Sequence, residues 1–445
     1  MTDTLNKDAR DHTLASTAWK AIIQDYDIMD EISRKGYYRI SARTIKKYRE
    51  PRLMAKWDSN ENLPAALRDR HLNILPVSRS EYLLSNVNLY EHLPEFVTTE
   101  PGNLHQIRQL DLESLDCGNI TSESNAINAM VATGTLDSFL GDDDRTVETF
   151  NGRMGTDAFS FDINRYTGGS LTVHVDRAQM EIDGGFENHK NVIIIEAKNV
   201  LHPDFHIRQL YYPYRVWKHR VNKPIRLIFC QYYNMMYRLI EYRFTDPNNY
   251  SSIERVSSAY YTFQDISVTM RDIIKLWKSI TPVPDVPNPS IPFPQADKMD
   301  RIISLMEHMQ DNEPMTTADI TDYMGLDVRQ SNYYTNAGRY LDLFERQSHG
   351  STECALTPEA RQILSLDYKN RQLALVSKIL SHQVFYDFFG RLFIDKISQT
   401  RLRSEAATYL EQRNICNHTT SRRRASTVLG WLKWIGRLPE FAENQ

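Results

Sequence analysis

Two acidic residues and a lysine stand at the ends of two successive segments that are typical of β-strands. Asp183 closes a long alternating segment, and Glu196, Ala197 and Lys198 close the β-branched run that follows it. Because side chains two apart in a strand point to the same face, Glu196 and Lys198 share a face, and Asp183 can approach them from the adjacent strand end. Two carboxylates beside an ammonium group suit metal-assisted hydrolysis of a phosphodiester: oxygen ligands hold Mg²⁺, and the lysine orients or helps deprotonate the attacking water.

An acid two residues before a lysine carries no information by itself. About two such pairs are expected by chance in a chain of this composition, and two occur, Glu196 with Lys198 and Asp367 with Lys369. Only the first pair ends a strand-like segment, follows an aspartate on the preceding strand and precedes an amphipathic helix. Asp367 and Lys369 lie in a region of helical periodicity. The context of the first pair therefore favours a hydrolytic site.

The segments around these residues predict a mixed α/β core with the order helix, strand, strand, strand, helix, strand. The first helix is expected over residues 120–133, with Thr121 or Ser122 as its N-cap. The remaining elements are expected at Asp157 to Ile163, Leu171 to Asp183, Val192 to Ile195, residues 205–219 (a helix), Ile225 to Tyr233 and Met236 to Phe244. The apolar run Val192 to Ile195 suits a strand that is covered on both faces.

The acidic pair and the lysine resemble the active-site motif of a nuclease superfamily. Asp183, twelve intervening residues and Glu196-Ala197-Lys198 are similar to the motif of the PD-(D/E)XK nucleases, and the predicted element order is similar to their core. Ile182 stands where the motif is named for proline, a substitution that is common in such enzymes. The resemblance implies a Mg²⁺-dependent nuclease with a mixed-sheet core, and metal ligands at Asp183, Glu196 and Ala197.

The resemblance spans roughly residues 119–245 and implies two further catalytic residues. Members of the superfamily often carry an acid on the preceding helix, which Glu123 matches, and a glutamine on the following helix, which Gln209 matches. The implied catalytic set is therefore Asp183, Glu196, Lys198, Gln209 and Glu123. The wider arrangement resembles a type II restriction endonuclease, whose members cut duplex DNA at a short sequence and leave a 5′-phosphate.

Plainer explanations stay open for the same residues. Solvated charges at a strand end would also account for Asp183, Glu196 and Lys198. Glu123 fits equally well as a first-turn acid stabilised by the helix dipole, and Gln209 fits an exposed helix surface. Glu181 and Glu187 are expected to be exposed, although either could be a second metal ligand. His202 and His206 are expected not to bind metal.

Charge is segregated along the chain. The formal net charge is −4, which argues against binding to nucleic acid through bulk charge. From Arg34 to Lys56, however, nine Lys/Arg accompany a single acid and several aromatic residues, a composition that suits phosphate contact as well as a solvated face. A second basic patch, from Ile415 to Leu438, contains no acid. The residues expected to contact DNA in the two patches are Arg43, Lys46, Lys47, Arg49 and Arg52, then Arg422, Arg423 and Arg424.

Six prolines between Pro282 and Pro294 predict a semi-rigid spacer, and helical periodicity dominates after it. Helices near Met299 to Met309, Thr317 to Met324 and Val328 to Leu343, followed by a hairpin at Gln347 to Leu356, have the order of a winged helix-turn-helix. Arg329, Gln330 and Asn332 on the third helix could read base edges. A second helical unit ends in a long helix from Thr419 to Ile435.

The expected division has five parts. They are an N-terminal basic DNA-contacting region (1–115), a nuclease core (116–280), a proline-rich linker (281–297), a winged helix-turn-helix (298–370) and a second helical, helix-turn-helix-like unit (371–445). An amphipathic helix with apolar residues from Trp19 to Ile32 precedes the first basic patch.

Several function classes are disfavoured. No apolar run approaches the ~18 residues that span a bilayer, no secretory signal is evident, and the four scattered cysteines are expected to be reduced, so we expect a cytoplasmic protein without a membrane partner. There is no GxxxxGK loop and no methyltransferase fingerprint. The expected partners are double-stranded DNA, a second copy of the chain, because a duplex cut needs two active sites, and a separate cognate DNA methyltransferase. The alternatives are a non-catalytic DNA-binding regulator and a structure-selective nuclease.

Overall fold

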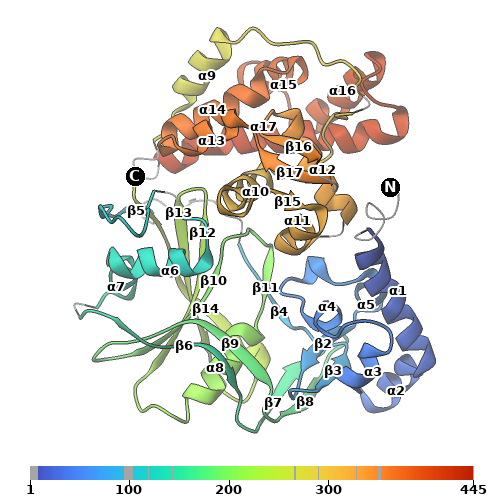
Figure 1. The fold of residues 1–445 in the computed structure, drawn as a ribbon, viewed down its shortest axis with the longest axis vertical. Coiled ribbons are helices and arrows are strands. Elements are labelled where there is room, and N and C mark those ends of the chain that lie inside the picture. The colour runs from blue at the N-terminus through green and yellow to red at the C-terminus, as the bar shows by residue number, and fades with distance from the viewer. Residues whose placement is uncertain are drawn as a thin grey trace.

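The computed structural model of the chain describes residues 9–94, 104–118, 120–142, 144–264, 267–288, 290–326, 328–348 and 352–443. Parts of the predicted N-terminal region (1–8 and 95–103), Pro289 of the proline-rich segment and the turn of the predicted hairpin (349–351) lie outside the described residues. The C-terminal helices stand at one end of the molecule, and the N-terminal unit and the central sheet lie side by side below them (Figure 1). Within the described chain, no helix is long and apolar enough to cross a membrane.

The N-terminal unit packs short helices on a three-stranded sheet of order β1-β3-β2. The single amphipathic helix predicted there is two helices, α1 (Ala9–Asp25) and α2 (Ile28–Lys35). Asp27 adopts a left-handed φ of 46°, which interrupts the helix in spite of its continuous apolar spacing. The remaining elements are β1 (Tyr38–Ser41), α3 (Ala42–Lys46), α4 (Arg52–Ala55), a 3₁₀ turn η1 (Asn60–Asn62), α5 (Ala65–Arg68), β2 (Asn73–Pro76) and β3 (Glu81–Ser85).

The central unit is mixed α/β and contains a seven-stranded sheet of order β5-β14-β13-β12-β10-β9-β6. Neighbours are antiparallel except for the pairs β10–β12 and β14–β5. The strands are β5 (Leu104–Gln106), β6 (Val147–Gly155), β9 (Gln179–Glu187), β10 (Val192–Lys198), β12 (Ile225–Tyr233), β13 (Met236–Phe244) and β14 (Ile253–Thr262). Two of them, β12 and β13, have the bounds that the sequence predicted.

Both faces of β10 are covered, as its apolar run predicted. Ile193 and Ile195 belong to one hydrophobic cluster with Met130 of α6 (Glu123–Ala132). Ile194 belongs to another cluster with Leu210 of α8 (Arg208–Trp217). Ser122 is the N-cap of helix α6, and its side chain accepts a hydrogen bond from the Asn125 amide. The predicted N-cap is therefore present. A short helix, α7 (Thr135–Leu140), follows α6.

The prediction of one strand from Leu171 to Asp183 is wrong, because the structure has two strands there. Arg177 has a left-handed φ of 52° and turns the chain between β8 (Ser170–Val175) and β9. Strand β8 pairs with β7 (Phe159–Asn164) in a separate two-stranded sheet. Strand β9 continues to Glu187, so Asp183 lies in the middle of a strand and not at its end.

Three other elements were displaced or absent in the sequence-based expectation. Strand β6 was not predicted because most of its residues are exposed and its pairing with β9 is irregular. Strand β14 was not predicted either, since its first half is exposed. The helix predicted from residue 205 begins at Arg208, because β11 (Asp204–His206) pairs with β4 (Tyr90–His92) and joins the central unit to the N-terminal unit.

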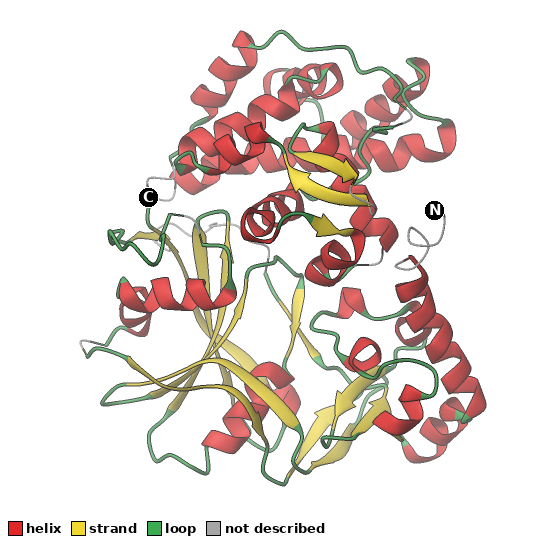
Figure 2. Ribbon diagram, viewed as in Figure 1, coloured by secondary structure: helices red, strands yellow, loops and turns green. Residues whose placement is uncertain are grey.

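The C-terminal part is mostly helical, whereas strands dominate the central unit (Figure 2). Its first elements are α10 (Met299–Asn312), β15 (Met315–Thr316), α11 (Thr317–Met324), α12 (Val328–Tyr340), β16 (Phe344–Ser348), β17 (Thr352–Leu356) and α13 (Pro358–Leu364). The strands form a sheet of order β15-β17-β16. Then come α14 (Tyr368–Leu380), α15 (Gln383–Phe389), a π-helical turn (Gly390–Ile394), α16 (Gln399–Gln412) and α17 (His418–Glu443).

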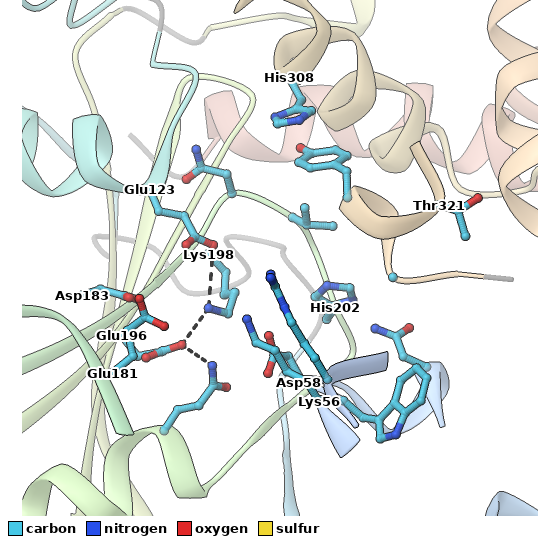
Figure 3. A pocket seen from close by; sticks show the side chains of 18 of the residues that line it. Lys56, Asp58, Glu123, Glu181, Asp183, Glu196, Lys198, His202, His308 and Thr321 are labelled. Atoms are coloured by element: carbon cyan, nitrogen blue, oxygen red, sulfur yellow. Dashed lines mark hydrogen bonds and ion pairs between the residues drawn. The ribbon is translucent and has the colours of Figure 1, made fainter. Parts of the chain in front are cut away.

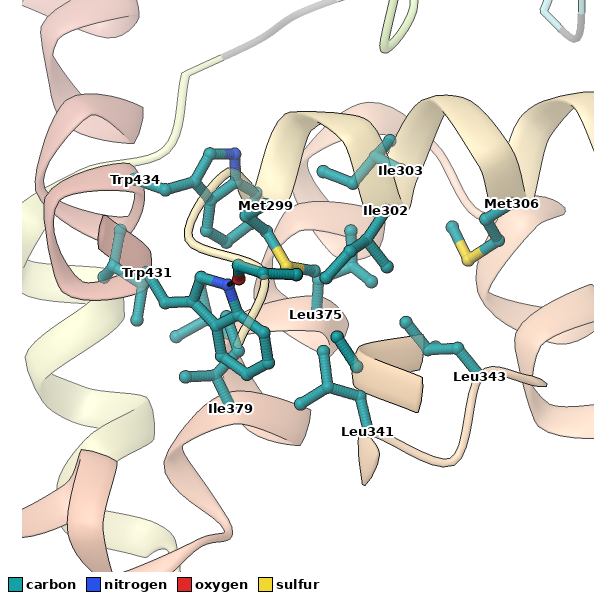
Figure 4. Packing of buried hydrophobic residues seen from close by; sticks show 14 of the residues in the cluster. Met299, Ile302, Ile303, Met306, Leu341, Leu343, Leu375, Ile379, Trp431 and Trp434 are labelled. Carbon is teal, nitrogen blue, oxygen red and sulfur yellow. Dashed lines mark hydrogen bonds between the residues drawn. The ribbon is translucent and has the colours of Figure 1, made fainter. Parts of the chain in front are cut away.

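The two helical units predicted after the proline-rich segment share one hydrophobic core. Met299 and Leu341 from the first unit belong to the same buried cluster as Leu375 and Trp431 from the second (Figure 4). The division at residue 370 therefore does not separate two cores.

The proline-rich segment, predicted as a spacer, is packed against the C-terminal helices. Val283 exchanges backbone hydrogen bonds with Ser381 and Gln383, and Phe293 and Ala296 are buried in the C-terminal core. Helix α9 (Met270–Ser279), which the sequence did not predict, also contacts these helices through Trp277, whose indole donates to the Tyr386 carbonyl. The segment thus belongs to the C-terminal unit.

Candidate active site

The pairing between β9 and β10 stops at Gly184 and Ile195, and the candidate site begins at this point. The Asp183 carboxylate accepts a hydrogen bond from the Ala197 amide at 2.9 Å through Oδ2. A side chain thus takes the amide hydrogen that a continued backbone ladder would have used. Gly185 permits the local geometry, because a Cβ there would lie 2.5 Å from the Phe150 carbonyl oxygen of β6.

Lys198 lies at the centre of a group of carboxylates. Its Nζ donates to Glu196 Oε1 at 2.7 Å and to the Ala197 carbonyl at 3.0 Å, and lies 3.7 Å from Glu123 Oε1. Gln209 of α8 donates a further hydrogen bond to Glu196 Oε1. The Glu196 and Lys198 side chains are only 5% and 15% exposed. The structure therefore brings together all five residues of the implied catalytic set; Figure 3 shows Glu123, Asp183, Glu196 and Lys198.

Burial and mutual repulsion shift the pKa values of these groups. Burial raises the pKa of Glu196 well above its usual value, and the nearby Asp183 carboxylate raises it further. Burial also raises the pKa of Glu123. For Lys198, burial alone would lower the pKa, but the carboxylates around it, with Glu196 the strongest, raise it well above its usual value. The carboxylates outnumber the single ammonium group, so an added cation would stabilise the site.

The donor atoms fit Mg²⁺ by their chemistry. Carboxylate oxygens of Asp183 and Glu196 and the carbonyl oxygen of Ala197 are hard ligands, and Mg²⁺ is commonly held by one or two carboxylates while it keeps several waters. No group of three or more His, Cys, Asp or Glu in the described ranges is arranged to hold a metal.

The cluster opens into a cavity of about 1130 Å³ where three parts of the chain meet. We call this cavity the catalytic cleft. The N-terminal unit contributes Arg49, Arg52 and Lys56 to the lining. The central unit contributes the catalytic set together with Arg153 and Arg208. The far side is formed by α10 and α11, through His308, Asp319, Thr321 and Tyr323. Glu196 is buried but Glu123 is 44% exposed, and these carboxylates face a space that is lined by cations and by further acids such as Asp319.

Asp58, which the sequence analysis did not identify, also lines the catalytic cleft (Figure 3). Burial would raise its pKa, but Lys198 and then Lys56 outweigh burial and lower it. The Asp58 carbonyl accepts a hydrogen bond from the His206 amide, which holds the loop against β11. No sequence signal marks this residue, because it comes from a different unit, far from the motif in the chain.

The predicted DNA-contacting residues fall into two groups. Arg49 and Arg52 line the catalytic cleft. The others do not, namely Arg43, Lys46, Lys47, Arg329, Gln330, Asn332, Arg422, Arg423 and Arg424. The Arg329 guanidinium is engaged on its own helix, since its Nε donates to the Tyr333 hydroxyl at 2.6 Å. DNA contact by these residues stays a prediction.

The neighbouring acids and histidines lie as follows. Glu181 is exposed in the cleft and binds Arg153, whereas Glu187 binds Lys223 at 2.5 Å. His206 is buried beside the Tyr250 hydroxyl, and burial lowers its pKa to about 3. His202 Nδ1 lies 3.5 Å from Glu61 Oε1. No metal-binding group includes either histidine in the part of the chain that the structure describes.

Comparison with known protein families finds three matching stretches of the chain. Residues 16–84 match a domain of unknown function (DUF6996), residues 85–262 match another (DUF6997), and residues 301–440 match a third (DUF7226). No curated protein and no solved structure matches the chain. The third match spans both helical units, in agreement with their common core, and the second contains every residue of the implied catalytic set.

Proposed function

We propose that the chain is a Mg²⁺-dependent type II restriction endonuclease that hydrolyses phosphodiester bonds of double-stranded DNA. The observation that carries the proposal is the convergence of Glu123, Asp183 and Glu196 around Lys198 in a cleft lined by arginines and lysines. With α7 and the strands outside the seven-stranded sheet (β7, β8 and β11) left aside, the order α6-β6-β9-β10-α8-β12 supports it, since it is similar to the core of the PD-(D/E)XK nucleases. Carboxylates gathered around a lysine and beside basic residues suit a phosphate ester better than a neutral substrate.

Five residues of the cluster have a proposed role in this reaction. Asp183, Glu196 and the Ala197 carbonyl would hold Mg²⁺, which when bound neutralises charge on the scissile phosphate. Lys198 donates a hydrogen bond that orients the attacking water toward phosphorus. The water oxygen forms a bond to phosphorus as the bond to the 3′ oxygen breaks, so the product carries a 5′-phosphate and a 3′-hydroxyl. Gln209 holds Glu196 in place from α8.

The C-terminal unit would hold and read the DNA. The order α10, β15, α11, α12, β16, β17 is that of a winged helix-turn-helix, in which α12 would carry Arg329, Gln330 and Asn332 to base edges. Since none of these three residues lines the catalytic cleft, they would contact DNA outside it. A homodimer would supply the second active site for a duplex cut, and a separate methyltransferase would protect the host DNA.

A plasmid digest tests the proposal. Purified protein is incubated with unmethylated plasmid in Mg²⁺, in Mn²⁺ and in EDTA, and the products are resolved on a gel. We expect discrete fragments with either metal and none in EDTA, and sequencing of the ends should show 5′-phosphates at one short sequence. Intact plasmid in both metals would contradict the proposal.

A non-catalytic DNA-binding regulator is the second candidate. The observation that favours it is that no three His, Cys, Asp or Glu residues of the described chain are arranged to hold a metal. Retardation of DNA in a gel without cleavage in either metal would support the regulator.

A further inference from the structure

A second large cavity lies between the central unit and the C-terminal helices. We call it the second groove. Its volume is about 990 Å³. One side is formed by the end of β4 and the connection from β10 to β11, and the other by the start of α10 together with α16 and α17. Neither the catalytic set nor the predicted base-reading residues line it, so the proposed function leaves it unexplained.

Cations outnumber acids along the second groove. Two of its basic residues are neutralised, since Arg301 pairs with Glu61, and Arg437 with Asp300 at 3.2 Å. Three others, whose side chains make no hydrogen bond or ion pair with a described residue, are Lys298, Arg403 and Lys433. Asp297 and Asp300 are the only acids among the described residues that line the groove. An excess of unpaired cations favours an anionic ligand.

The lining of the second groove also contains apolar residues, including an aromatic ring. Phe393 is half-buried and packs on Phe389 with ring centroids 4.8 Å apart. Gly436 of α17 makes room for this ring, because a Cβ there would lie 2.8 Å from Phe393 Cζ. Leu429 and Leu93 continue the apolar surface. Cations beside an aromatic ring are the combination by which proteins hold single strands of nucleic acid, through phosphates and stacked bases.

The second groove adjoins the catalytic cleft. Val200 lines the cleft, Leu201 and Pro203 line the second groove, and His202 between them lines both. The two cavities are therefore separated by one short connection between β10 and β11. A strand whose scissile phosphate lies near Lys198 could continue past His202 into the second groove.

We propose that the second groove binds the sugar–phosphate backbone of a nucleic acid strand that continues from the catalytic cleft. The inference rests on the proposed function for the identity of the strand. The contact with the cleft through His202 favours a polymer over a free nucleotide. Arg403 and Lys433 are the side chains that would meet its phosphates, because they are exposed and have no partner among the described residues.

The test is a double substitution, Arg403→Gln with Lys433→Gln. Arg271→Gln with Lys275→Gln is the matched control: it also removes one arginine and one lysine, both exposed on α9 and outside both cavities. Fluorescence anisotropy with labelled single-stranded and duplex DNA, in EDTA so that nothing is cut, gives the affinity as a function of salt. Circular dichroism and thermal unfolding check that both variants are folded.

We expect the groove pair to weaken DNA binding on the order of tenfold at ~0.1 M salt and to reduce the slope of log K against log salt by about 1.4 to 1.8, the loss of two phosphate contacts. The control pair should leave both unchanged. Equal effects from the two pairs would overturn the inference. So would a deoxynucleotide monophosphate that binds the wild type and not the groove pair while DNA binding is unchanged, which would assign the groove to a free nucleotide.

The same protein distinguishes failure of the inference from failure of the proposed function. If the groove pair loses DNA affinity but the wild type never cuts in Mg²⁺ or Mn²⁺, the strand-binding groove stands and the nuclease falls. If the wild type cuts and the groove pair binds and cuts like the control, the nuclease stands and the strand path through the second groove is wrong.

Discussion

The catalytic cleft and the second groove are similar in size, about 1130 and 990 Å³, and both are bordered by arginines and lysines. They differ in what lies beneath those cations. The cleft has carboxylates gathered around Lys198, with Glu196 buried, whereas the second groove has apolar lining residues and only Asp297 and Asp300 as described acids. Buried charges that compensate one another only in part are costly, and such sites are where reactive groups concentrate. Exposed cations over an apolar surface cost little and suit binding alone.

One acidic residue contacts lining residues of both cavities. Glu61 of η1 pairs with Arg301 of α10, which lines the second groove, and lies 3.5 Å from His202, which lines both cavities. The three residues come from the N-terminal, C-terminal and central units. The comparison therefore predicts that changes in the carboxylate cluster abolish chemistry, that changes at Glu61 alter how the units fit together, and that changes of border cations alter binding.

The largest effect is expected from Lys198→Ala or Asp183→Ala. Removing the group that is proposed to orient the water, or a proposed metal ligand, should lower the rate of DNA cleavage by about a thousandfold or more. Binding measured in EDTA should change little, because neither side chain is needed for phosphate contact along the cleft border. Single-turnover cleavage and anisotropy measure the two effects separately.

Lys275→Ala on α9 is the control for these variants, since it removes a lysine that lines neither cavity. If Lys198→Ala cleaved DNA as fast as this control, the cleft would not be the catalytic site, and the proposed difference between the cleft and the second groove would be wrong.

The next effect is a loss of stability in Glu61→Gln. Arg301 is 6% exposed, and removal of its charged partner leaves a buried cation unpaired, which we expect to cost about 2–4 kcal/mol of unfolding free energy. Urea unfolding at neutral pH measures the change. Glu405→Gln is the control, because Glu405 also pairs with two arginines, Arg391 and Arg401, but on the surface, where little change is expected.

The effect of Glu61→Gln should depend on pH. Burial would raise the pKa of Glu61, but the hydrogen bond to His202 and the charges of Arg301 and Lys298 lower it to about 2. A depressed pKa contributes stability that is complete above the unfolded value of 4.5 and is lost as the pH falls toward 2. The difference between wild type and variant should therefore be smaller at pH 3 than at pH 7. A constant difference would show that the ion pair does not act through this carboxylate.

The sequence predicted the parts of the site that follow from local pattern. The run Val192 to Ile195 indicated a strand covered on both faces, and Glu196 and Lys198 do lie on the face of β10 that meets Gln209 of α8. Strand periodicity also gave β12 and β13 correctly. These predictions depend on side chains a few residues apart, for which alternation decides burial.

The sequence could not predict what depends on backbone conformation or on contacts between distant segments. Nothing in the residue types shows that Asp27 and Arg177 adopt a left-handed φ, yet each divides an element. Asp58 reaches the cleft only because β11 pairs with β4. Lys433 lies in a basic patch that the sequence did identify, but its place in the second groove depends on how α17 packs against the start of α10.

A smaller effect is expected from Asp58→Asn. The N-terminal unit supplies two acids to the cleft, Glu50 and Asp58, and the charge of Asp58 acts on Lys198. We expect kcat to fall about tenfold, with KM unchanged, because Asp58 would position Lys198 through its charge and would not itself contact the DNA. Asp69→Asn, exposed on the same unit, is the control. A change in KM without a change in kcat would assign Asp58 to substrate binding.

The smallest effect is expected from the first basic patch, which the cleft divides. Arg49 and Arg52 line the cleft, whereas Lys46 and Lys47 lie outside it. Arg49→Gln with Arg52→Gln should weaken DNA binding by about fivefold and reduce the salt slope, since phosphate contacts made near the active site are lost. Lys46→Gln with Lys47→Gln removes the same charge outside the cleft and should weaken binding less than the cleft pair does. Anisotropy in EDTA measures both pairs. Equal losses of affinity would mean that DNA binds the whole basic patch, and that the arginines at the cleft border contribute no more than the lysines outside it.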